Sequence, residues 1–60
     1  MDNRLREIRE SCRVSITELS RRTGITRKTI YKIEAGGGLT ARTMQKVADA
    51  LGKTVPEIFF

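Results

Sequence analysis

The stretch that decides the fold is VSITELSRRTGITRKTIYKIEAGG, residues 14–37. Ser15 follows an apolar residue and precedes Glu18 by three positions, which is the pattern of a capping box at a helix N-terminus. Gly24 then ends that helix, and Thr26 starts another one that ends before the glycines. The stretch predicts two short helices joined by a tight turn, at residues 16–23 and 27–34.

Similar helix starts and stops recur on both sides of this stretch. Asp2 or Asn3 can cap a first helix, Thr40 precedes a helix that ends at Gly52, and Thr54 starts a last one. Apolar residues between these marks fall at helical spacing, and no segment alternates with a period of two. The sequence predicts one all-α domain over residues 1–60 with helices at about 3–12, 16–23, 27–34, 41–51 and 55–59.

The composition limits what so short a chain can hold. Its 60 residues lie near the lower limit for a domain that folds on its hydrophobic core alone. A lone Cys12 and no histidine predict neither a disulfide nor a metal site, and Cys12 is expected to be a small core residue. The net charge of +5 favours a polyanionic partner, although many small proteins are basic for solubility alone.

Segment 27–34 places its charges against the stability of its own helix. Arg27 and Lys28 lie in the first turn, where the helix dipole favours anions. No acidic residue stands between Glu18 and Glu34. This arrangement is unfavourable for an isolated helix and therefore indicates that the cations meet a negatively charged partner.

A helical wheel divides this segment into two faces. Ile30 and Ile33 define the buried side, and Lys28 and Lys32 lie nearly opposite to them. A solvated amphipathic helix is the alternative, but such a face usually mixes charges of both signs. The pair of helices predicts a helix-turn-helix whose second member faces the phosphates and base edges of DNA. Further positive charge is expected from the end of the preceding helix, at Arg21 and Arg22.

The chain resembles the Cro/cI-type helix-turn-helix family of phage and bacterial repressors, also called the XRE family. The resemblance extends through LREIRE, residues 14–37 and TARTMQKVADALGKTVPEIF, and so covers essentially the whole chain. Its diagnostic residues are Ser15, Glu18, Leu19, Gly24, Ile30, Ile33, Glu34, Gly36 and Ala50-Leu51-Gly52. It implies a five-helix lambda-repressor-like fold and a cytoplasmic, prokaryotic or phage repressor that binds specific sequences of double-stranded DNA.

The resemblance also implies roles for individual residues of this chain. Contacts to base edges fall on Arg27, Lys28 and Lys32. Contacts to phosphates fall on Ser15, Thr29 and Arg42. An ion pair is expected between Arg9 and Glu34, because both border apolar helix faces, where charged residues are usually paired.

Several features depart from the family pattern, and three of them carry structural expectations. Arg13 stands where glycine commonly closes the first helix, and it is expected to adopt a left-handed conformation. Ser20 replaces the usual alanine at the crossing of the two helices, and its hydroxyl is expected to bond a carbonyl one turn earlier. The triglycine at 36–38 replaces a loop that is often rich in Lys and Arg, so backbone N–H groups are expected to contact phosphates there.

A homodimer is expected, because one helix-turn-helix reads only a few base pairs. Ile58 and Phe59 are predicted core residues, which leaves Phe60, Val55 and Pro56 as an apolar patch for the dimer interface. A frayed C-terminus with Phe60 folded back onto the domain is the alternative.

A protein-interaction module is the competing functional hypothesis: an adaptor, antirepressor or antitoxin subunit that keeps the fold without reading DNA. Such a module is expected to carry acidic or apolar residues on the exposed face of 27–34, where this chain has cations. The sequence has no histidine and no phosphate-binding loop, so an enzyme is not predicted. No cofactor, metal, small-molecule ligand or membrane segment is predicted either.

Overall fold

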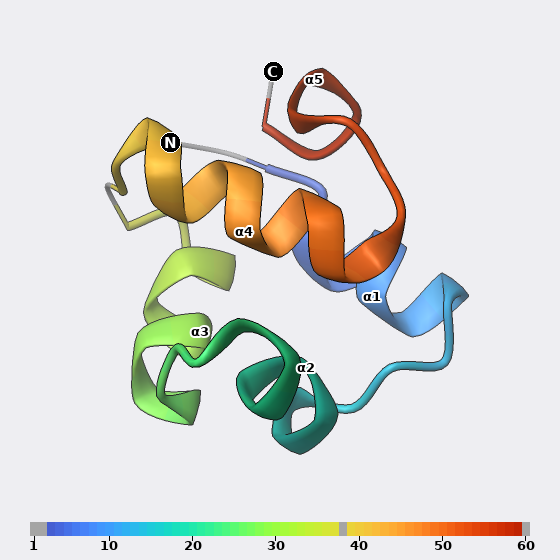
Figure 1. Ribbon diagram of the computed structural model, residues 1–60, viewed down its shortest axis with the longest axis vertical. Coiled ribbons are helices and arrows are strands. Elements are labelled where there is room, and N and C mark those ends of the chain that lie inside the picture. The colour runs from blue at the N-terminus through green and yellow to red at the C-terminus, as the bar shows by residue number, and fades with distance from the viewer. Residues whose placement is uncertain (1–2, 38, 60) are drawn as a thin grey trace.

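Helices account for all of the regular structure in residues 3–37 and 39–59, the ranges that the computed structural model describes. In chain order they are α1 (Leu5–Ser11), α2 (Ile16–Thr23), α3 (Arg27–Glu34), α4 (Ala41–Leu51) and α5 (Val55–Ile58), as Figure 1 shows. The predicted all-α class is therefore confirmed, and the predicted bounds of α2, α3 and α4 match the structure.

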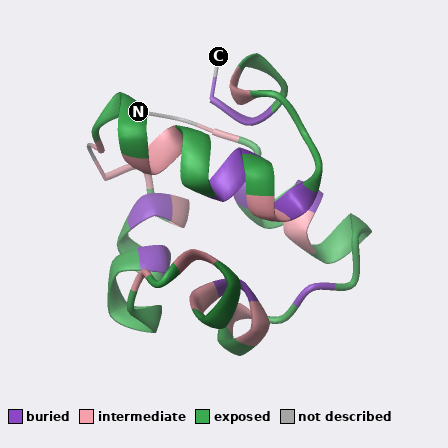
Figure 2. Cartoon of the chain, in the orientation of Figure 1, coloured by how far each residue is buried: buried purple, intermediate pink, exposed green. Residues whose placement is uncertain are grey.

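The helices share one hydrophobic core. The longest helix, α4, lies across the middle of the molecule and packs against both α2 and α5, while α3 packs against α1 and α2 (Figure 1). Figure 2 shows that every helix contributes buried positions. The core consists of Leu5, Ile8, Val14, Leu19, Ile30, Ile33, Val47, Ala48, Leu51, Ile58 and Phe59.

Side-chain caps explain why the central helices start where they do. Ser15 accepts a hydrogen bond from the backbone N–H of the third residue of α2, and Thr26 and Thr40 do the same for α3 and α4. Each cap satisfies one of the N–H groups that a helix start leaves without a partner. At α5, Glu57 accepts from the backbone N–H of Thr54 at 2.8 Å and from the Thr54 hydroxyl at 2.9 Å.

The first helix is shorter than predicted at both ends. Asn3 lies outside the helix, and its Oδ1 accepts from the Leu5 N–H at 2.9 Å, so regular helix begins at Leu5 rather than at residue 3. Helix α1 ends at Ser11, and Cys12 is exposed rather than a core residue. The prediction was wrong because the apolar spacing that includes Cys12 continues past the point where the helix stops. Asp2 lies outside the described residues.

The turn after α1 has the left-handed residue that was predicted. Arg13 has φ of 58°, and it is the non-glycine residue with positive φ in the described ranges. Its N–H donates to the Glu10 carbonyl at 3.0 Å, and the Val14 N–H donates to the Arg9 carbonyl at 3.0 Å. These two bonds end the helix as a Schellman motif does. They also turn the backbone toward Ser15 and the start of α2.

Candidate nucleic-acid interface

The turn between α2 and α3 is held by hydrogen bonds on both of its sides. Gly24 adopts φ of 76°, and its N–H donates to the Ser20 carbonyl at 2.9 Å. The Ser20 hydroxyl donates forward to the Ile25 carbonyl at 2.6 Å, and not to a carbonyl one turn earlier as predicted. Thr23 donates to the Leu19 carbonyl at 2.8 Å and accepts from the Ile25 N–H at 3.1 Å. The two hydroxyls therefore tie the start of α3 to the end of α2.

Helix α3 has one face in the core and the other in solvent. Ile30 and Ile33 are 0% and 2% exposed. On the opposite side the structure exposes all of the predicted base-contacting residues, together with two neighbours. These exposed residues are Arg27, Lys28, Thr29, Tyr31 and Lys32.

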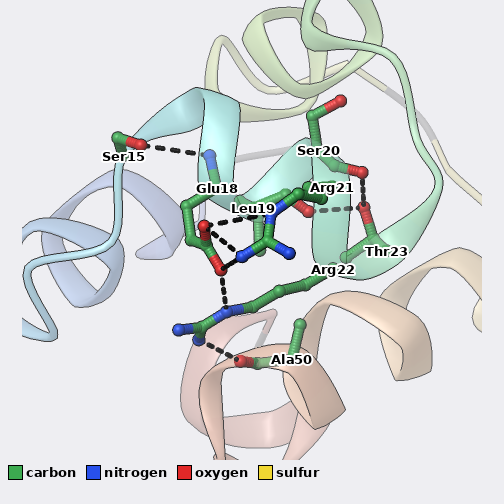
Figure 3. A network of polar contacts seen from close by, with 8 residues as sticks. All are labelled: Ser15, Glu18, Leu19, Ser20, Arg21, Arg22, Thr23 and Ala50. Atoms are coloured by element: carbon green, nitrogen blue, oxygen red, sulfur yellow. Dashed lines mark hydrogen bonds and ion pairs between the residues drawn. The ribbon is translucent and has the colours of Figure 1, made fainter.

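The cations of the first two helices lie in ion pairs. Helix α1 and the residue before it carry two ion pairs between neighbouring turns, Arg4–Glu7 and Arg6–Glu10. In α2 a single acid, Glu18, serves two arginines that follow it in the chain (Figure 3). Cations paired one to one with an acid add little to an electrostatic surface for DNA, whereas the single charge of Glu18 balances only one of its two arginines.

The network around Glu18 gives Arg21 and Arg22 a structural role at the end of α2. Arg21 Nη2 lies 2.7 Å from Glu18 Oε2, and Arg22 Nε lies 2.8 Å from the same oxygen. Arg22 also donates to the Ala50 carbonyl at 3.1 Å, which joins α2 to α4 (Figure 3). The hydrogen bonds from Arg21 and Arg22 lower the pKa of the Glu18 carboxyl, so this acid stays ionised. Both arginines thus take part in the scaffold, and with one acid for two arginines α2 keeps a net positive charge.

The cations of α3 and α4 form no such pairs. Arg27, Lys28, Lys32 and Arg42 make no ion pair with any residue in the described ranges, and all four are exposed. The first turns of α3 and α4 contain no acidic residue, in contrast to those of α1, α2 and α5. The structure therefore leaves positive charge uncompensated on the elements predicted to face DNA.

The starts of α3 and α4 share one local arrangement. Thr26 accepts from the Thr29 N–H at 3.3 Å, and the two hydroxyls are joined at 2.9 Å. Thr40 accepts from the Thr43 N–H at 3.2 Å, and these two hydroxyls also lie 3.2 Å apart. A neutral threonine thus occupies the third position of these helices, where α2 has Glu18. A first turn without an acidic residue keeps the positive end of the helix dipole available to an anion.

The last turn of helix α3 is held by polar contacts with α1 and with a residue before it. Arg9 Nε donates to Glu34 Oε2 at 2.7 Å, and the two side chains are 11% and 9% exposed. Arg9 Nη1 also donates to the Val14 carbonyl at 2.9 Å, so one guanidinium joins α1, the following turn and α3. Asn3 Nδ2 adds a bond to the Ile33 carbonyl at 2.8 Å. The last turn of α3 is thereby tied to the N-terminal part of the chain.

A comparison with known protein families agrees with the helix-turn-helix formed by α2 and α3. The helix-turn-helix family matches residues 5–58. The chain belongs to the Cro/cI-type (XRE) helix-turn-helix family. A comparison with curated proteins finds no match to it.

Membership in the Cro/cI-type family makes this chain a DNA-binding domain of the kind found in transcription regulators. Its partner class is double-stranded DNA. None of the described helices has the length and apolar character required to cross a membrane. Within the same residues, no group of three or more His, Cys, Asp or Glu side chains is placed to hold a metal ion.

Sequence reasoning missed the structural roles of two residues of this Cro/cI-type domain, Asn3 and Thr43. Asn3 was considered only as a helix cap, yet it also contacts the last turn of α3. Thr43 received no role, although the spacing of Thr40 and Thr43 repeats that of Thr26 and Thr29 and could have revealed it. No sequence signal identifies the Asn3 contact, because its partner is a backbone carbonyl thirty residues away.

Proposed function

We propose that this protein is a sequence-specific repressor that places α3 in the major groove of its operator. The observation that carries the proposal is the row of exposed, unpaired cations on α3, at Arg27, Lys28 and Lys32. Arg and Lys side chains pair best with the O6 and N7 atoms of guanine, so each half-site is expected to contain guanine. The competing interaction module, with acids or apolar groups on this face, receives no support from it.

Phosphate contacts position the domain and supply much of its affinity. We assign them to Ser15, Thr29 and Arg42, at the starts of α2, α3 and α4. The Ser15 hydroxyl oxygen already accepts from the Glu18 N–H at 3.0 Å, so it would contact a phosphate as a donor. Arg42 is exposed in the first turn of α4 and has no acidic partner among the described residues.

Selection of bound sites from a random DNA pool tests the readout. Lys28→Ala and Lys32→Ala should each change the preferred base at one position, by about 1–3 kcal/mol for a good contact. Arg42→Ala should weaken binding to all sequences alike and reduce the salt slope by about one. Lys53→Ala, an exposed cation on the α4–α5 connection, is the matched control and should keep the consensus. An unaltered consensus for both α3 variants would refute the assignment.

A titration against random-sequence DNA separates the two functional classes. The wild-type chain should bind, and its affinity should fall steeply between low and high salt because bound cations release counterions from the DNA. An interaction module without DNA readout would show no binding at either salt concentration.

We further propose that the repressor acts as a homodimer joined near α5. Ile58 and Phe59 are buried, as predicted, while Val55 is half-buried and Pro56 is exposed. Phe60, the remaining member of the proposed interface, lies outside the described residues. The operator should be palindromic, with half-sites about 10–10.5 base pairs apart. Phe60→Asp should weaken cooperative binding without unfolding the monomer, and one chain per operator would rule the interface out.

A further inference from the structure

The C-terminus of α3 ends in a complete Schellman motif. Gly36 has φ of 95°, and its N–H donates to the Ile33 carbonyl at 3.0 Å. The Gly37 N–H donates to the Lys32 carbonyl at 2.9 Å. In this motif the residue in the position of Gly37 usually contacts the side chain in the position of Lys32. That side chain is one of the proposed base-contacting residues.

Gly37 is required here for space and not for its backbone conformation. It is absent from the described glycines with positive φ, which are Gly24, Gly36 and Gly52. A Cβ atom at residue 37 would lie 2.8 Å from Lys32 Cγ and 2.8 Å from the Lys32 carbonyl oxygen. Both distances are well below van der Waals contact, so any side chain at this position forces Lys32, the loop or both to move.

One of the two crowded atoms, Lys32 Cγ, belongs to the part of the side chain that sets its direction. Cγ is the second carbon of the stem, and its place is decided by the first side-chain torsion, which has few allowed values in a helix. With Cγ packed over the Gly37 backbone, the rest of the stem leaves α3 from a defined point. Gly24 and Gly52 show no such contact, because a Cβ at either position would meet nothing within 4 Å.

We propose that Gly37 is a specificity-determining positioning residue that holds the Lys32 side chain in the direction needed to read its base. The proposal rests on the proposed function of α3. It assigns the second glycine of the loop to readout, whereas the first glycine closes the helix. A residue outside the recognition helix would thereby influence which sequence is preferred.

Site selection with three variants tests this role. Lys32→Ala first identifies the operator position that Lys32 reads. Gly37→Ala should then reduce discrimination at that same position by about tenfold, the size of one good base contact, and leave the other positions unchanged. In the Lys32→Ala background, Gly37→Ala should change the preference no further. Gly52→Ala is the control, because it strains a left-handed turn after α4 without touching α3, and it should keep the consensus.

Other outcomes decide between the proposal and its alternatives. If Gly37→Ala weakens all sequences alike, the glycine acts through the loop and the phosphate contacts of α4. If Gly37→Ala does not fold but folds when combined with Lys32→Ala, the contact with the stem is what the glycine relieves, and the proposal stands. If the combined variant also fails to fold, the contact with the Lys32 carbonyl oxygen prevents folding by itself. Gly37 then has only a structural role. A wild-type chain that selects no sequence would instead defeat the proposed function itself.

Discussion

Breaking the Arg9–Glu34 ion pair tests how firmly the recognition helix is held. The two side chains are 11% and 9% exposed and 2.7 Å apart, so removing either one leaves a buried charge without its partner. Such a loss costs about 3–5 kcal/mol, against about 0–1 kcal/mol for an exposed pair. A domain of this size has a total stability of roughly 3–9 kcal/mol, so the loss would be a large part of it.

The two single variants should differ in how much free energy of unfolding they lose. Arg9→Met removes both the ion pair and the bond to the Val14 carbonyl, and we expect a loss near the upper end of that range. Glu34→Gln keeps an amide oxygen that still accepts from Arg9, so its loss should be near the lower end. The double variant should lose clearly less than the sum, because the second change removes the charge that the first one stranded.

Urea denaturation followed by circular dichroism measures all three variants and the wild type. The exposed pair Arg6–Glu10, whose side chains are 73% and 59% exposed at 3.6 Å, provides the matched control within α1. Arg6→Met and Glu10→Gln should each cost at most about 0.5 kcal/mol. Small, additive losses for Arg9→Met and Glu34→Gln, equal to those of the control, would refute the argument that this pair holds α3.

Three other changes have expected outcomes that follow from local geometry. Arg13→Gly should raise the free energy of unfolding by about 0.5–1 kcal/mol in a denaturant titration, because glycine tolerates the φ of 58° that strains arginine. Ser20→Ala should lower it by about 1 kcal/mol, since the Ile25 carbonyl loses its 2.6 Å bond; an unchanged midpoint would mean that water replaces the hydroxyl. The pKa of Glu18 is lowered from 4.5 in the folded protein, so its stabilising contribution is complete above that pH and disappears as the pH falls through the lower folded value. Glu18→Gln should therefore make acid unfolding, followed by circular dichroism, less steep below pH 4.5, and an identical acid transition would contradict this reasoning.

The helices of this domain could be predicted because the signals that start and stop them are local. Ser15, Thr26 and Thr40 cap helices at the residues expected, and Gly24 and Gly52 end two of them in left-handed turns. A cap bonds within three residues of its own position, so its partner is visible in the sequence. The buried face of α3 was predictable for a similar reason, since Ile30 and Ile33 fall on one side of the helix.

The predictions were wrong or incomplete at positions where the sequence alone does not decide what surrounds a side chain. Cys12 continues the apolar spacing of α1, yet the helix stops at Ser11 and the thiol is exposed. Ser20 bonds across the turn instead of along its own helix. The pairing of Arg21 and Arg22 with Glu18 was not predicted. Spacing alone does not rank these partners, because the choice depends on side-chain torsions and on neighbouring elements.

The sequence by itself determined the helical class, the positions of the caps and turns, and the family to which the chain belongs. Only the tertiary structure decided which cations remain available to DNA and what holds α3 in place. The contact of Asn3 with the Ile33 carbonyl and the approach of Gly37 to Lys32 depend on how the chain packs and how its turns close. The physical reason is one of range. Capping and periodicity act within a turn or two of the helix, whereas charge pairing and close packing depend on atoms that folding brings together.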